Sequence, residues 1–112
     1  MKDNIPLSSN LTIGIKESDG KIDYSEIDWK FVTRMAIRMN KNKAKYGKNN
    51  WKLPINLEEI EQALLRHVVA ILNPVENDPE TRQEHLAAIG CNAQILNFHL
   101  DESQSKQPGV LD

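Results

Sequence analysis

The sequence predicts an all-α domain of three main helices, and two observations support this prediction. Apolar residues recur at every third or fourth position in three separate stretches, which is the spacing of one face of an α-helix. Residues that end helices separate these stretches: Gly47 and Pro54 lie between the first two, and Asn73 and Pro74 lie between the last two. The expected helices span about residues 25–46, 57–72 and 79–100.

The first helix follows an N-terminal arm, residues 1–22, which we interpret as irregular with at most one short strand around Ile13. Asp23 or Ser25 is expected to cap the helix, because either side chain can accept a hydrogen bond from a free N–H of the first turn. The apolar stripe of this helix consists of Ile27, Phe31, Met35 and Met39.

The second helix has signals at both ends. Asn56 and Glu59 have the spacing of an N-terminal capping pair, and Asn73 followed by Pro74 ends the helical pattern. The side chains expected to point inward are Ile60, Leu64, Val68 and Ile71.

The third helix is expected to begin where Pro79 follows Asp78, because proline loses no hydrogen bond at the first helical position. Gly90 and the alanines near it would let another helix approach closely. Residues 23–101 then form one domain with a flexible tail at 102–112. Because two helices carry apolar residues on more than one side, we expect helical hairpins that assemble as a homodimer or homotetramer. The expected apolar side of the third helix consists of Leu86, Ile89, Ala93 and Leu96.

Composition excludes several classes of protein. No apolar run approaches the roughly 20 residues of a membrane span, and residues 1–10 lack the apolar core of a signal peptide. We therefore expect a cytoplasmic protein with no membrane partner. The single cysteine, Cys91, excludes an intramolecular disulfide and argues against a structural zinc site, so we interpret it as a packing residue.

The net charge of −2 conceals an asymmetric distribution. No acidic residue lies between Asp28 and Glu58, and this interval carries +8, so the remaining residues carry −10. A basic helix beside acidic helices is the arrangement of a site that holds anions and cations together. The basic residues are Lys30, Arg34, Arg38, Lys41, Lys43, Lys45, Lys48 and Lys52.

Three polar residues lie on helix faces that would otherwise be apolar. His67 has the helical spacing of the inner face of the second helix, while His85 and Asn92 are seven residues apart on the third. Taken alone, each of them could be a structural core residue whose polar group has one hydrogen-bond partner. Polar residues on facing helices are costly to bury unless they bond to one another or to a ligand, which favours a functional role for the set.

Carboxylates cluster near the turn between the second and third helices. Glu58 and Glu61 are three residues apart and share one side of a helix, while Asp78, Glu80 and Glu84 surround the start of the next. Each is also explained as a solvated side chain that favours a helix N-terminus. If Glu61 and Glu84 face each other across the hairpin, the acids can bind a hard cation such as Mg²⁺.

Four strings in order, KYGKNNW (45–51), ALLRHVVAIL (63–72), ENDPET (76–81) and HLAAIGCNAQIL (85–96), resemble one family. This is the N-terminal family of phage-associated dATP/dGTP diphosphohydrolases, a MazG-related group of small α-helical nucleotide pyrophosphohydrolases. The resemblance covers residues 30–100 approximately. It departs from the MazG pattern of ExxE followed by ExxD, because Gln83 stands at the last acidic position. Family members also often carry a second histidine where this chain has Ala88.

The resemblance implies hydrolysis of a purine deoxynucleoside triphosphate to the monophosphate and pyrophosphate in the host cytoplasm, with Mg²⁺ or Mn²⁺. The residues expected to take part in the chemistry are Glu61, His67 and His85. The expected metal ligands are Glu58, Glu61, Asp78, Glu80 and Glu84. The residues expected to contact the purine nucleotide are Arg38, Lys45, Tyr46, Asn50, Trp51, Arg66 and Asn92.

Several alternatives remain beside the enzyme. Trp51 could instead close the core beneath its loop, and Arg66 could be a solvated surface residue. The chain as a whole fits a non-catalytic protein that binds or sequesters a nucleotide. A nucleic-acid binder using the basic stripe is the weakest alternative, because the sequence is acidic overall and lacks a helix-turn-helix or zinc signature.

Overall fold

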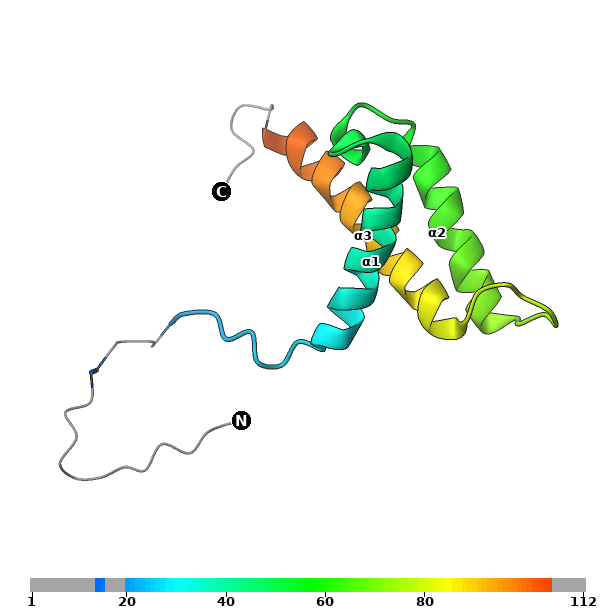
Figure 1. Cartoon of the computed structure of the whole chain (residues 1–112). Coiled ribbons are helices and arrows are strands. Elements are labelled where there is room, and N and C mark those ends of the chain that lie inside the picture. The colour runs from blue at the N-terminus through cyan, green and yellow to red at the C-terminus, as the bar shows by residue number, and fades with distance from the viewer. Residues whose placement is uncertain (1–13, 16–19, 106–112) are drawn as a thin grey trace, which may run out of the picture.

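The computed structural model describes residues 14–15 and 20–105, which contain three α-helices and one short 3-10 helix (Figure 1). The all-α fold class is therefore confirmed. The short strand expected around Ile13 falls outside the described residues, apart from Gly14 and Ile15, which have no regular structure. The elements are α1 (Trp29–Tyr46), η1 (Asn50–Lys52), α2 (Leu57–Leu72) and α3 (Arg82–Ser105).

Helix α1 begins later than expected because its cap is Asp28, not Asp23 or Ser25. The Asp28 carboxylate accepts a hydrogen bond from the backbone N–H of Lys30 at 3.1 Å, which satisfies a donor of the first turn. At the other end Gly47 has φ +98°, a conformation that suits glycine, and ends the helix as predicted.

Helix α2 has the predicted bounds. The Asn56 side chain accepts a hydrogen bond from the backbone N–H of Glu58 at 3.0 Å, which confirms the cap. The predicted inner face is also confirmed, because Ile60, Leu64, Val68 and Ile71 are all half-buried, as is His67.

Helix α3 begins at Arg82, three residues after the predicted start at 79, and continues to Ser105. Thr81 and Glu84 form a reciprocal capping pair: the Thr81 N–H donates to the Glu84 carboxylate at 2.8 Å, and the Glu84 N–H donates to the Thr81 hydroxyl at 3.1 Å. Asp78 does not cap the helix. Its carboxylate instead accepts from the Glu80 N–H at 2.9 Å and closes a turn around Pro79.

Helix α3 is the central element, since α1, α2 and η1 all pack against it. Figure 1 shows α2 running antiparallel beside α3 and α1 crossing it. The predicted apolar side of α3 is only partly right, because Leu86 and Ala93 are exposed. All the buried residues of the described chain belong to α3: His85, Ala87, Ala88, Cys91 and Ile95.

Gly90 provides the close approach between α1 and α3. A Cβ atom at this position would lie 2.8 Å from Sδ of Met35 and 3.1 Å from Cζ of Phe31, well inside ordinary contact distances. The small residue therefore sets how near α1 lies to α3, and with it the position of the basic side chains that α1 carries.

The segment between α1 and α2 is anchored on α3 through Trp51. Its ring contacts Phe98 edge to face, with 5.1 Å between the centroids, and its carbonyl oxygen accepts a hydrogen bond from Nε2 of His99 at 2.8 Å. The interpretation of Trp51 as a residue that closes the core beneath its loop agrees with this packing.

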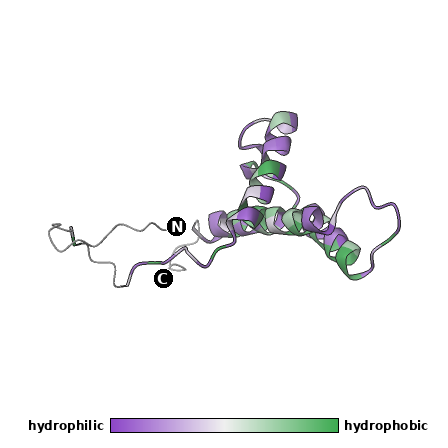
Figure 2. Ribbon diagram, turned by 60° about the horizontal axis from the view of Figure 1, so that its bottom comes forward, coloured by the Kyte–Doolittle hydropathy of each residue, from purple (hydrophilic) through white to green (hydrophobic). Residues whose placement is uncertain are grey.

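Apolar side chains remain on the outer surface of α2. Leu65, Val69 and Leu72 are each more than half exposed. Figure 2 shows apolar and polar residues interspersed along the helices, while the loop that joins α2 and α3 is mostly hydrophilic. None of the helices in the described residues is long and apolar enough to cross a membrane.

Candidate functional site

Two histidines, two carboxylates and an arginine meet where α2, the α2–α3 loop and α1 converge on α3. Nδ1 of His67 lies 2.8 Å from Nδ1 of His85, and Nε2 of His85 lies 2.7 Å from an oxygen of Asp78. Oε1 of Glu80 lies 3.8 Å from Nδ1 of His67 and 3.6 Å from Nδ1 of His85. Together with Arg38, whose guanidinium donates to the other oxygen of Glu80 at 2.9 Å, these residues form what we call the histidine–acid cluster.

Local sequence explains how the loop presents its two acids. The turn around Pro79 uses one oxygen of Asp78 for the Glu80 N–H, which leaves the second oxygen for His85. The Thr81–Glu84 capping pair then fixes the first turn of α3, so that His85 points inward. Asp78 and Glu80 therefore lie beside the buried ring rather than in solvent.

The contacts of the cluster shift the pKa of three of its side chains. Burial alone would raise the pKa of Glu80, but the hydrogen bond and charge of Arg38 outweigh it and hold the carboxylate ionised. Burial, followed by the nearby Arg38 charge, lowers the pKa of His67, so this imidazole is neutral at neutral pH. The backbone N–H of Glu80 and then the His85 hydrogen bond lower the pKa of Asp78.

The hydrogen bonds restrict the tautomers of the two rings. The ionised Asp78 can only accept, so Nε2 of His85 carries a proton. When both rings are neutral, Nδ1 of His85 is consequently the acceptor, and Nδ1–H of His67 donates to it. This arrangement leaves a lone pair on Nε2 of His67.

The described residues contain one group of three side chains whose ligand-type atoms all lie within 4.8 Å of one another: His67, Glu80 and His85. The five acids expected to share a cation are not assembled in this way. Glu80 alone belongs to the group, and Asp78 contacts it through His85. The residues that could hold a metal ion are thus two imidazoles and one carboxylate.

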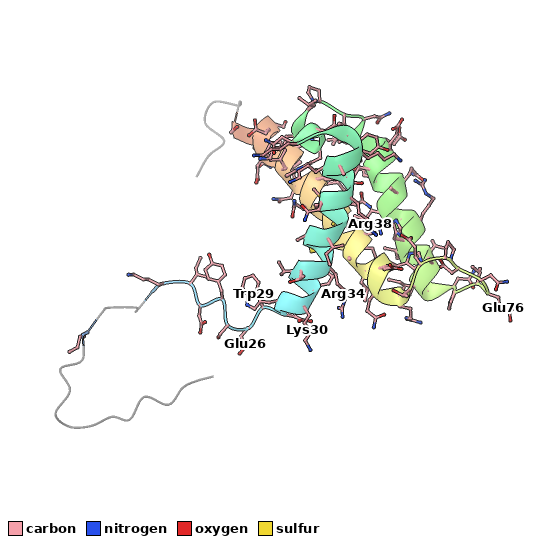
Figure 3. The ribbon with its side chains drawn as sticks, in the orientation of Figure 1. Glu26, Trp29, Lys30, Arg34, Arg38 and Glu76 are labelled. Atoms are coloured by element: carbon pink, nitrogen blue, oxygen red, sulfur yellow. The ribbon has the colours of Figure 1, made fainter. Side chains whose placement is uncertain are left out.

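A groove of about 420 Å³ opens between α1 and the start of α3, and we call it the charged groove. Arg34, Arg38 and Lys41 line its α1 side, while Glu80 and Glu84 line its α3 side. Figure 3 shows Arg34 and Arg38 on the part of α1 near the start of α3. Because Arg38 and Glu80 also belong to the histidine–acid cluster, the groove and the cluster are continuous.

A second cavity, of about 510 Å³, lies between the C-terminal end of α1, the 47–56 segment and α2. We call it the amide pocket, because five asparagines line it beside Tyr46 and Trp51. Asn42 lines both this pocket and the charged groove, so the two cavities adjoin there. The five asparagines are Asn40, Asn42, Asn49, Asn50 and Asn56.

Glu61 does not face Glu84, and this expectation is wrong because of the register of the hairpin. The contact between His67 and His85 sets the level at which α2 and α3 meet. Glu61 precedes His67 by six residues, which places it about 9 Å further along the helix axis. Glu61 is exposed, and Glu84 uses its carboxylate in the capping pair.

Two more candidates of α2 lie away from the cluster. Glu58 and Arg66 line a separate shallow cavity with Gln62 on an exposed side of the helix. Arg66 adjoins His67 in the sequence, and neighbouring helical residues point about 100° apart, so Arg66 turns outward when His67 turns inward. The solvated interpretation of Arg66 agrees with its exposure.

The remaining nucleotide-contact candidates divide between the cavities and their surroundings. Tyr46, Asn50 and Trp51 are brought together in the amide pocket. Lys45 lies outside the lining of both cavities, with its ammonium 5.1 Å from the centre of the Tyr46 ring. Asn92 is half-buried two helical turns from His85, about 10 Å along α3, and lines neither cavity.

Several residues that line the two cavities were not among the individual candidates, and Arg34, Lys41 and Asn42 are three of them. The signal that could have found them is the spacing of the basic stripe, since positions 34, 38 and 41 share one helix face. Asn42 carries no comparable signal, because its importance comes from the meeting of two cavities.

The family model described as dATP/dGTP diphosphohydrolase, N-terminal, matches residues 12–107. The chain belongs to this family. A dATP/dGTP diphosphohydrolase of Salmonella phage PMBT28 is 34% identical over 88 residues, covering 79% of this chain and 30% of the relative. The chain thus spans about 30% of the length of that diphosphohydrolase. No solved structure matches this chain.

Proposed function

We propose that the chain hydrolyses a purine deoxynucleoside triphosphate to the monophosphate and pyrophosphate. The observation that carries this proposal is the charged groove, where Arg34, Arg38 and Lys41 face carboxylates beside the two histidines. The diphosphohydrolase name of the phage relative and the family to which the chain belongs support the same reaction. The reaction would act on the nucleotide pool in the cytoplasm of an infected host.

The basic wall of the groove is suited to a triphosphate. Within the described part of the chain, Arg38 is the one lysine or arginine side chain with a carboxylate within 4.0 Å. Arg34 and Lys41 therefore offer their charges to a ligand rather than to a protein acid. Arginine can bind two phosphate oxygens at once through its planar fork, while lysine contributes a compact charge.

The acidic wall and the histidine–acid cluster are suited to a divalent cation and to the proton of an attacking water. A bound cation would neutralise charge on the phosphates and lower the pKa of the water. The chain contributes the ligands His67, Glu80 and His85, while Asp78 orients the His85 ring. Glu84, in the same groove, lies where a carboxylate could accept a proton.

The amide pocket is suited to the base. A side-chain amide offers both donors and an acceptor, which matches the mixed edge of a purine, and Tyr46 provides an aromatic face. Since Asn42 lines both cavities, one ligand can place its phosphates in the charged groove and its base in the amide pocket.

The test is pyrophosphate release by the purified chain from dGTP and dATP, with dCTP and dTTP as comparison substrates. We expect release from the purine nucleotides and its loss in the Glu80→Gln variant. The matched control is Glu76→Gln, because Glu76 is an exposed acid at the tip of the α2–α3 loop (Figure 3). Tight nucleotide binding without any pyrophosphate would refute the hydrolase and favour a non-catalytic nucleotide-binding protein.

We also propose that copies of the chain associate through the exposed apolar side of α2, where Leu65 and Val69 are each 53% exposed. Within residues 20–105 only five residues are buried, all on one helix, which is a small core and supports a partner copy. Light scattering should give a mass above 12.8 kDa, and the paired change Leu65→Gln and Val69→Gln should lower it. A monomeric wild-type chain would contradict this assembly.

A further inference from the structure

We propose that His67, Glu80 and His85 bind one transition-metal ion of the class of Mn²⁺, Co²⁺ or Zn²⁺. This inference extends the proposed function but does not depend on it, because the ion would bind in the absence of any nucleotide. It also differs from the all-carboxylate magnesium site expected from the sequence.

The first support is the geometry of three atoms. Nδ1 of His67, Nδ1 of His85 and Oε1 of Glu80 form a triangle with sides of 2.8, 3.6 and 3.8 Å. A point equidistant from the three atoms lies about 2.0 Å from each, which matches the length of a zinc–imidazole bond. A single ion can therefore reach all three atoms without a change of backbone, once the Nδ1 proton of His67 has moved to Nε2 of the same ring, which leaves Nδ1 free to bind.

The second support is that the other ends of two ligands are already held. Nε2 of His85 donates a hydrogen bond to Asp78 at 2.7 Å, and this contact orients the ring so that its other nitrogen, Nδ1, points at the triangle. The second oxygen of Glu80 accepts from Arg38 at 2.9 Å, which aims Oε1 the same way. Outer contacts of this kind, a carboxylate on a ligating imidazole in particular, orient ligands in metal sites.

The third support concerns Glu80. The hydrogen bond between the two histidine rings and a second hydrogen bond, from His85 to Asp78, give both Nδ1 atoms and Nε2 of His85 a partner without Glu80. That arrangement does not require Oε1 of Glu80 to lie 3.6 and 3.8 Å from the two ring nitrogens, beyond hydrogen-bonding distance of both. A cation between the three atoms gives this oxygen a partner.

The class of ion follows from the ligand types. Imidazole nitrogen favours Zn²⁺ and other first-row transition metals, whereas Mg²⁺ favours oxygen ligands and retains several waters. Two histidines with one carboxylate leave further coordination positions open. Glu80 also lines the charged groove, so these positions are accessible from the space proposed for the triphosphate.

The experiment is titration of the full chain, stripped of metal and without nucleotide, with Co²⁺ followed by visible absorption and with Zn²⁺ in competition. We expect one Co²⁺ per chain, displaced by Zn²⁺ and retained in a large excess of Mg²⁺. His67→Gln and Glu80→Gln should each weaken binding by more than the roughly 10- to 100-fold that loss of an outer contact costs. Asp78→Asn should fall within that smaller range.

Two variants serve as controls. His99→Gln removes a histidine that donates to the Trp51 carbonyl, outside the cluster, and Glu76→Gln removes an exposed acid of the α2–α3 loop. Both should bind Co²⁺ as the wild-type chain does. Because His67 and Glu80 are partly exposed, their variants should keep the helical circular dichroism of the wild type.

Absence of stoichiometric Co²⁺ binding, or binding that survives His67→Gln and Glu80→Gln unchanged, would overturn the site. Binding lost equally in His99→Gln would overturn it as well. These outcomes separate the site from the proposed function. A chain that binds Co²⁺ and releases no pyrophosphate keeps the site and loses the hydrolase, while hydrolysis with Mg²⁺ alone and no Co²⁺ binding does the reverse.

Discussion

Replacing Gly90 with valine tests the packing that places the basic wall of the charged groove. An added Cβ would lie 2.8 Å from Sδ of Met35 and 3.1 Å from Cζ of Phe31, so α1 and α3 must separate or both side chains must rotate. Overpacking of this kind costs about 1–3 kcal/mol, and the branched side chain of valine adds two further methyl groups to the contact. The two extra methyl groups place the overpacking cost in the upper part of this range, and helix propensity recovers less than about 1 kcal/mol of it. We therefore expect a net loss of about 1–2 kcal/mol in the free energy of unfolding.

The assay is urea unfolding followed by helical circular dichroism, with Ala93→Val as the control. Ala93 lies three residues further along α3 and is exposed, so valine there should cost only its propensity, about 0.5 kcal/mol. The same fall in stability for both variants would show that Gly90 is not the contact point of α1. The account of how α1 is held against α3 would then be wrong.

Three further predictions concern the core, the start of α3 and the free thiol. Ile95→Ala should lower the free energy of unfolding by about 2–4 kcal/mol in the same urea assay, because Ile95 is the largest buried apolar side chain among the residues that the structure describes. A loss below about 1 kcal/mol would show that Ile95 is not packed. Thr81→Ala should lower the melting temperature, because it removes a capping hydrogen bond that contributes about 1 kcal/mol to stability. The comparison is Thr33→Ala, at an exposed position within α1. Cys91 should react slowly with a disulfide reagent until urea unfolds the chain, because burial covers the thiol and raises its pKa; rapid reaction in the folded chain would contradict its packing.

The ends of α2 could be predicted because the decisive interactions are local. Asn56 caps a helix whose first turn follows immediately, and Asn73 with Pro74 stops it within two residues. The start of α3 could not be predicted in the same way. Asp78 before Pro79 has the pattern of a cap, but its carboxylate bonds instead to Glu80 and to His85, seven residues away.

The candidate site shows the same division. His67, His85 and Glu80 could be found from spacing and residue type, because each stands out against its surroundings. Glu58 and Glu61 have an equally suggestive spacing, yet the register of α2 on α3 leaves them exposed. That register depends on the path of the whole loop between the helices, which no short stretch of sequence encodes.

The basic wall lies between these two cases. Its helical periodicity is visible in the sequence, but the identity of the three side chains that face α3 depends on where Gly90 lets α1 cross. Asn42 illustrates the limit most clearly. Its position at the meeting of two cavities follows from three separate elements coming together.

A crystal structure of the chain with Mn²⁺ and a non-hydrolysable dGTP analogue tests directly whether the charged groove and the histidine–acid cluster form one site. The account predicts the ion bound to His67, Glu80 and His85, with the triphosphate against Arg34 and Lys41. A nucleotide bound on the exposed side of α2, with the three ligand atoms still bonded only within the protein, would contradict it.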